Sequence, residues 1–327
     1  MIEAIRRQDA PRFGRAQLAA AIAAATLCAT LAGPAAQAQP ANAPAAKPAA
    51  DTTVLTLIGT QGGPGLTVKR AGESSLLTVR GKRYLIDAGI GATRRLAEAE
   101  VTLPSLTAVF ITHQHNDHTA DLPGLMAIYA SQGHPLEIIG PPRTADFVAG
   151  VIAILRINWE IRAEQGGSSV SDAAAMFKAH DVQPGLVYSD DTVKVTAKEN
   201  AHFHFKAGST ASPNKSYAYR FQTPHKVVVF TGDTGEDPSL AKFAEGADIL
   251  VCEMVSARVG KAAAGPSRYH MVEEHLSPTQ VGQLARDAKV KKLVLSHLVG
   301  ADPEDIAEIK KWYPGEVVVG EDLQTFD

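Results

Sequence analysis

The heptapeptide Thr112-His113-Gln114-His115-Asn116-Asp117-His118 directly follows the apolar run Leu106–Ile111. That run is short and rich in β-branched and aromatic residues, so it predicts a buried strand. Side chains alternate along an extended backbone, so the first two histidines of the heptapeptide should point to one side. The turn after them should bring back a carboxylate and a third histidine. We expect a metal centre at the rim of a sheet; the alternative is a polar loop rich in histidine.

The N-terminal 38 residues have the layout of a secretory signal peptide. Four arginines precede the alanine-rich apolar stretch Ala16–Leu31, and Ala36-Gln37-Ala38 is a small-x-small cleavage site. The apolar stretch is shorter than the roughly 20 residues that a spanning helix needs. We therefore expect a periplasmic or secreted protein with no stable membrane anchor, and a retained anchor is the alternative.

Residues 39–50 are rich in proline and alanine, which is typical of a disordered tether, and residues 51–327 fit one large α/β domain. Residues 1–38 hold four basic and two acidic side chains, so their removal changes the formal net charge from -3 to -5. A mildly acidic protein is not typical of nucleic-acid binders. Only Cys252 would remain after cleavage, which excludes an internal disulfide. The sequence does not decide between a monomer and a homodimer.

Three predicted strands in the second half also end in residues that can bind metal: His202, Asp233 and His297. Each of them alone fits an ordinary polar turn. Together with the first cluster, they supply the ligand types that a two-metal site would otherwise lack. Both halves run from strands to helices, which suggests a four-layer αββα sandwich, although periodicity alone supports only an α/β class.

The sequence resembles the metallo-β-lactamase fold superfamily, and within it the ribonuclease Z and arylsulfatase-like branch. The matching motifs span residues 54–298: Gly59-Thr60-Gln61-Gly62-Gly63, Leu85-Ile86-Asp87-Ala88-Gly89, the H-x-H-x-D-H loop, Gly140-Pro141-Pro142, Ser216-Tyr217-Ala218-Tyr219-Arg220, Thr231-Gly232-Asp233-Thr234, Cys252-Glu253, His275 and Ser296-His297-Leu298. These metal motifs are highly specific for the superfamily and less specific for the branch.

The resemblance implies two divalent metal ions. The first would be held by His113, His115 and His202, the second by Asp117, His118 and His297, and Asp233 would bridge them. This set of histidines and carboxylates suits zinc, with manganese or iron as alternatives. Two ions about 3.5–4 Å apart would share a water whose pKa falls to about 7, which provides hydroxide at neutral pH.

Three assignments stay open. His204 competes with His202 as the third ligand of the first metal, although the Asn-x-His pattern after a strand favours His202. Asp87 either orients a ligand histidine or only caps a turn. Residues 143–180 are expected to be mainly helical, and they form either a lid over the pocket or a packing helix pair.

The resemblance also implies a general acid. In ribonuclease Z-like proteins a glutamate and a histidine at the places of Glu253 and His275 are thought to protonate the leaving group together. The glutamate would raise the pKa of the histidine and fix its tautomer. The alternative is a strand-capping Glu253 and a surface His275. Asp117 is expected to be both a ligand and a catalytic residue.

The fold alone does not determine which substrate the protein cleaves. Only eleven residues separate Arg220 from Gly232, where ribonuclease Z enzymes that process transfer RNA carry a long arm. We therefore expect an exported dinuclear hydrolase of a small ester, with a phosphodiester or aryl sulfate preferred. A lactone, carboxylic ester or β-lactam hydrolase and a non-catalytic metal-binding protein are alternatives, and a transfer-RNA 3′ endonuclease is disfavoured.

Overall fold

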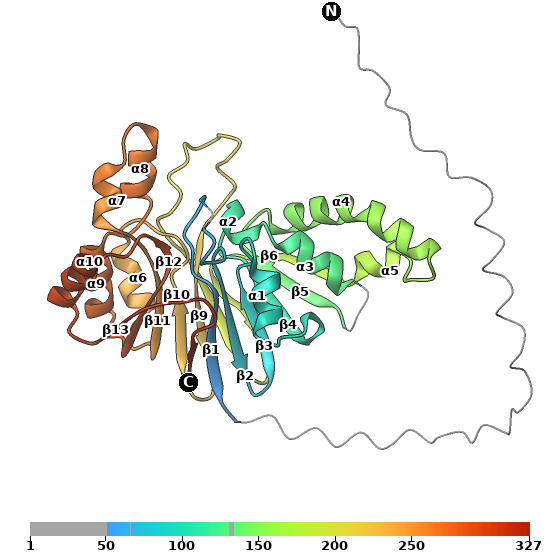
Figure 1. Ribbon diagram of the computed structural model, residues 1–327, viewed down its shortest axis with the longest axis horizontal. Helices are drawn as coiled ribbons and strands as arrows, with labels where there is room; N and C mark the ends of the chain where they lie inside the picture. Colours follow the sequence, from blue (N-terminus) through green and yellow to red (C-terminus); the bar gives the residue numbers. More distant parts are fainter. Residues whose placement is uncertain (1–50, 66, 131–133) are drawn as a thin grey trace, which may run out of the picture. The chain divides into compact units, whose positions relative to one another are not determined.

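The computed structural model describes residues 51–65, 67–130 and 134–327. The expected signal peptide (1–38) and tether (39–50) therefore lie outside the described residues. Two seven-stranded sheets form the centre of the fold (Figure 1). None of the described helices is both long enough and apolar enough to cross a bilayer.

The first sheet carries the strands of the N-terminal half and one strand from the C-terminus. From edge to edge it contains β14 (Thr325–Phe326), β1 (Thr53–Gly59), β2 (Ser74–Val79), β3 (Lys82–Ile86), β4 (Leu106–Phe110), β5 (Leu136–Gly140) and β6 (Phe177–Asp181). The pairings from β14 to β3 are antiparallel, and those from β3 to β6 are parallel. The carboxyl ends of the parallel strands therefore meet at one edge.

The second sheet repeats this arrangement. Its strands are β13 (Glu316–Val319), β12 (Lys292–Val299), β11 (Ile249–Val255), β10 (Val227–Phe230), β9 (Tyr217–Gln222), β8 (Lys194–Glu199) and β7 (Gly185–Ser189). The pairings from β13 to β10 are parallel, and those from β10 to β7 are antiparallel. Strand β11 is buried along its whole length because both faces of the sheet are covered.

Helices cover the outer face of each sheet, so the expected four-layer αββα sandwich is confirmed (Figure 1). The first sheet is covered by α1 (Ala92–Glu98), α3 (Leu122–Tyr129), α4 (Thr144–Glu164) and α5 (Val170–Ala175), and the second by α6 (Pro238–Phe243), α9 (Pro278–Asp287) and α10 (Pro303–Trp312). The connections contain η1 (Leu103–Ser105), α2 (Asn116–Thr119), α7 (Ala257–Ala262) and α8 (Pro266–Glu273). Aromatic and aliphatic side chains between the sheets form the central core.

The segment 143–180 is mainly helical, as expected, because α4 and α5 occupy most of it. Its last residues form the strand β6, which pairs with β5. The ring of Trp159 is buried in α4 and stacks on Phe177 of this strand, with 6.2 Å between the ring centroids. Helix α4 therefore packs on the first sheet, as the alternative to a lid proposed. Its first turn meets the metal loop, where Gln114 Nε2 donates to Thr144 Oγ1 at 2.9 Å.

Candidate metal centre

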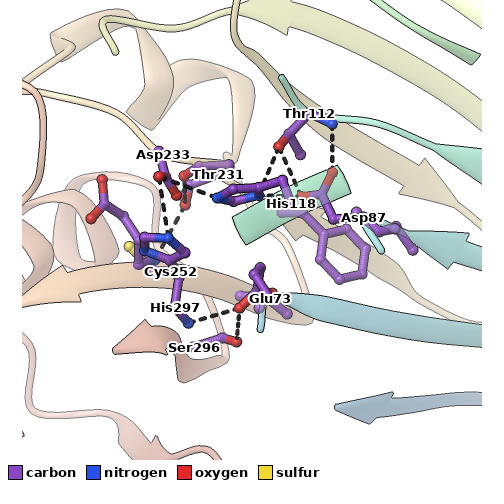
Figure 2. Close-up of a pocket in the computed structure, with 14 residues that line it drawn as sticks. Glu73, Asp87, Thr112, His118, Thr231, Asp233, Cys252, Ser296 and His297 are labelled. Carbon is purple, nitrogen blue, oxygen red and sulfur yellow. Dashed lines mark hydrogen bonds and ion pairs between the residues drawn. The ribbon is translucent and has the colours of Figure 1, made fainter. Parts of the chain in front are cut away.

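Asp87 fixes the conformation of the loop after β4. Its Oδ1 accepts from the backbone N–H of Thr112 at 2.7 Å, and its Oδ2 accepts from the Thr112 hydroxyl at 2.8 Å. The same Oδ2 accepts from His118 Nδ1 at 2.8 Å, so the Nε2 atom of His118 points toward Asp233 (Figure 2). Asp87 thus orients a predicted ligand histidine, and its own backbone adopts the left-handed φ of 59° to do so.

Three imidazole nitrogens converge on one point. The distance from His115 Nδ1 is 3.0 Å to His113 Nε2 and 3.2 Å to His202 Nε2. A tetrahedral ion with metal–nitrogen bonds of about 2.0–2.1 Å requires nitrogens roughly 3.3–3.4 Å apart, so this spacing fits a metal. His202 Nδ1 donates to the backbone carbonyl of Glu274 at 2.9 Å, which leaves its Nε2 lone pair facing the other two histidines.

A second set of donors lies beside the first. Asp117 Oδ2 is 3.0 Å from His297 Nε2 and 3.6 Å from His118 Nε2. The Gly63 backbone N–H donates to Asp117 Oδ2 at 2.9 Å and holds the carboxylate in place. A Cβ atom at residue 63 would lie 2.1 Å from this oxygen, which explains why the loop carries glycine at this position.

Asp233 lies close to histidines of both sets, and Figure 2 shows it beside His118 and His297 of the second set. Its Oδ2 is 3.3 Å from both His118 Nε2 and His297 Nε2, and it is 3.8 Å from His113 Nε2. Its Oδ1 is buried and has no hydrogen-bond partner among the described residues. A buried carboxylate oxygen without a donor is costly unless a cation satisfies it. The donor set therefore fits two adjacent divalent ions.

Burial and neighbouring groups set the protonation states of three predicted ligands. Burial lowers the pKa of His202 to about 3 and that of His113 well below its ordinary value, so both rings are neutral and able to bind metal. Burial alone would raise the pKa of Asp117, but the hydrogen bond from His297 and the charge of His118 lower it. Ionised carboxylates and neutral imidazoles are the protonation states that divalent ions require.

Glu253 and His275 form a buried pair at the edge of the centre. Glu253 Oε2 accepts from His275 Nδ1 at 2.7 Å, and Glu253 Oε1 accepts from the Thr234 backbone N–H at 2.7 Å. Burial alone would lower the pKa of His275, but the adjacent Glu253 carboxylate raises it to about 9. His275 is only 3% exposed, so the alternative that placed it on the surface is wrong.

Two further histidines, His204 and His270, lie near the centre. His204 is exposed, and its ring lies 6.4 Å from that of Tyr269, outside the group of converging donors that contains His202. His270 Nδ1 is 2.6 Å from a carboxylate oxygen of Glu274, and His270 Nε2 is 3.4 Å from His275 Nε2. His270 therefore lies beside His275.

Sequence reasoning missed Glu73. Its Oε2 accepts from the Ser296 hydroxyl at 2.6 Å and from the His297 backbone N–H at 2.8 Å (Figure 2). His297 adopts a left-handed φ of 45°, which is unfavourable for a residue with a side chain. Burial raises the pKa of Glu73 to about 7. The available signal was a single acidic residue placed directly before the segment 74–79, which forms the strand β2.

Comparisons with known proteins identify the family and the fold. The sequence pattern of the family described as "Beta-lactamase superfamily domain" matches residues 82–298. A protein named ribonuclease Z from Mycobacterium sp. (strain KMS) is 29% identical over 279 residues, which cover 82% of this chain and 94% of the relative.

Two solved structures share the fold. A metallo-beta-lactamase fold protein from Bacillus subtilis has a TM-score of 0.64 and 23% identity, with 84% of this chain and 98% of that chain covered. The short form of human tRNase Z has a TM-score of 0.59 and 20% identity, with the same coverage of 84% and 98%. The chain therefore belongs to the β-lactamase superfamily and is a hydrolase of the metallo-β-lactamase fold with ribonuclease Z among its relatives.

Proposed function

We propose that the protein is an exported hydrolase that uses two divalent metal ions, with zinc preferred, to cleave a small ester. A phosphodiester or aryl sulfate is the preferred substrate class. The observation that carries the proposal is the position of Asp233 between two sets of converging donors, with one buried oxygen that no described residue satisfies. Export rests on the signal-peptide layout of residues 1–38.

Divalent ions held by the two donor sets would supply Lewis acidity and an activated water at neutral pH. The protein contributes orientation: Asp87 holds His118, and the Glu274 carbonyl holds His202. His275 keeps a proton at neutral pH because Glu253 lies against its Nδ1. Its Nε2–H is then able to protonate the leaving oxygen, and the imidazole regains its proton from solvent.

Two features support a small ester over transfer RNA. Strands β9 and β10 are joined by the short turn 223–226, where the Thr223 hydroxyl accepts from the Lys226 backbone N–H at 2.9 Å. The mildly acidic chain also lacks the basic excess that phosphate-backbone binding uses. The names of the relatives make transfer-RNA cleavage the alternative to be tested.

The test is a panel of chromogenic phosphodiester, sulfate, lactone and β-lactam substrates together with a precursor transfer RNA. Wild type and Asp233→Ala are assayed after loading with zinc or manganese. We expect turnover of one small-ester class, two metals per chain in wild type, and a rate lower by more than about 100-fold in the variant. Equal rates in both proteins, or cleavage of transfer RNA alone, would overturn the proposal.

The role of the acid pair has its own test. His275→Ala should lower turnover most for substrates with poor leaving groups, which need a proton most. The slope of log kcat against leaving-group pKa should therefore become steeper in the variant. A uniform loss across leaving groups would assign His275 a structural role.

A further inference from the structure

Aromatic side chains lie against the ligand histidines of the metal centre. The ring centroid of Phe203 lies 4.6 Å from that of His202 and 5.2 Å from that of His115. Phe205 stacks on Phe203 with 4.7 Å between centroids and an interplanar angle of 26°. The loop that follows β8 thus carries a pair of stacked rings outward from the ligand histidines.

A second segment brings another ring to the same place. Tyr269 belongs to α8, and its ring centroid lies 6.4 Å from that of His204. His270 follows Tyr269 in the same helix, and its ring centroid lies 6.1 Å from that of His115. Figure 1 shows the loop after β8 and the α7–α8 segment extending beyond the sheets on the side where α2 lies. Both segments therefore lie beside the donor groups, since Phe203 and His270 each have a ring near that of His115.

Two of these rings are largely exposed: Phe205 is 41% exposed and Tyr269 is 52% exposed. A large apolar side chain gains more from burial than from contact with water, so exposed rings beside a reactive centre favour a role in binding. Flat aromatic groups pair with such rings in offset or edge-to-face geometry. A saturated alkyl group lacks this geometry and buries less surface.

We propose that Phe203, Phe205 and Tyr269 form an aromatic shelf that binds a planar aryl group of the substrate, so that the site selects aryl esters over alkyl esters. The inference rests on the proposed function, and it names the substrate class of the same centre. Phe203 supports the ligand histidines as well, whereas Phe205 and Tyr269 lie farther out. The outer two rings are therefore the positions that test selectivity without disturbing the metals.

The experiment measures binding without turnover. Phenylphosphonate and methylphosphonate, two inert anions that differ only in the aryl group, are titrated into the metal-loaded protein by calorimetry. Wild type should bind the phenyl compound more tightly. Phe205→Ala and Tyr269→Ala should each weaken phenylphosphonate binding by about 2- to 10-fold and leave methylphosphonate binding unchanged. Ile157→Ala, at a 69% exposed apolar position on α4, is the matched control and should change neither.

The outcomes separate the two proposals. Equal affinity for both phosphonates, equal loss for both in the variants, or no binding of either would overturn the shelf. Phenyl selectivity that depends on Phe205 in a protein without ester turnover would support the shelf and overturn the proposed reaction. Metal content, measured on every variant, should remain at two per chain; a variant that loses metal is replaced by Phe205→Leu or Tyr269→Leu, for which the same outcomes apply.

Discussion

Replacing Glu73 by alanine should weaken metal binding on the His297 side of the centre. The carboxylate accepts two hydrogen bonds, from Ser296 and from the backbone of His297, and thereby holds His297 in its left-handed conformation. Loss of partners that orient a ligand typically costs 10–100-fold in metal affinity, or about 1.4–2.7 kcal/mol. The buried N–H left without an acceptor should also lower the stability of the fold by about 1–3 kcal/mol.

The assay is a titration of metal-free protein with Zn²⁺ against a competing chelator, which resolves the two binding steps. Glu73→Gln keeps an acceptor oxygen at the same place and should restore most of the affinity. Asp305→Ala is the matched control, because Asp305 is also buried and accepts from the Ala257 backbone N–H at 3.0 Å, but it lies on α10. This control should lower the melting temperature and leave both metal affinities unchanged.

Wild-type affinity at both steps in Glu73→Ala would refute this reasoning. An equal loss of affinity at both steps, in parallel with the loss of stability, would refute it as well, because general unfolding would then account for the effect. The expected signature is one step near its wild-type affinity and one step weakened.

Three further predictions concern the ligands, the metals and pH. His202→Ala should reduce the bound metal toward one per chain, whereas His204→Ala should keep two, as measured by elemental analysis. Metal removal by a chelator should lower the melting temperature, since free metal at 100 times its Kd contributes about 2.7 kcal/mol, and added Zn²⁺ should restore it. Burial alone would raise the pKa of Asp190, but hydrogen bonds from Tyr84 and from the Thr192 backbone lower it. A lowered carboxylate pKa stabilises the fold above the unfolded value of about 4, and this stability is lost progressively as pH falls from there through the lower folded-state pKa. Asp190→Asn should therefore destabilise the protein by about 1–3 kcal/mol at pH 7, and the difference from wild type should shrink in denaturant titrations below pH 4.

The ligands of the metal centre could be predicted where the residues that indicate them lie close together in the sequence. The loop 112–118 places several donors within one short segment, so its chemistry was readable before any fold was known. Asp233 and His297 were predicted because each follows an apolar run, and parallel strands bring their carboxyl ends to one edge. The strand β6 was missed because the helical pattern before it continued into a short half-exposed segment.

The sequence by itself determined the fold class and the candidate ligands, because buried strands appear as short apolar runs and the ligands follow directly after them. Only the tertiary structure decided which histidine faces the centre: His202 is turned inward by the Glu274 carbonyl, and His204 is exposed beside Tyr269. It also decided the role of Glu73, which supports His297 although 224 positions separate the two residues. Such contacts have no local pattern, because they arise only when the two sheets pack together and bring distant strand ends to one edge.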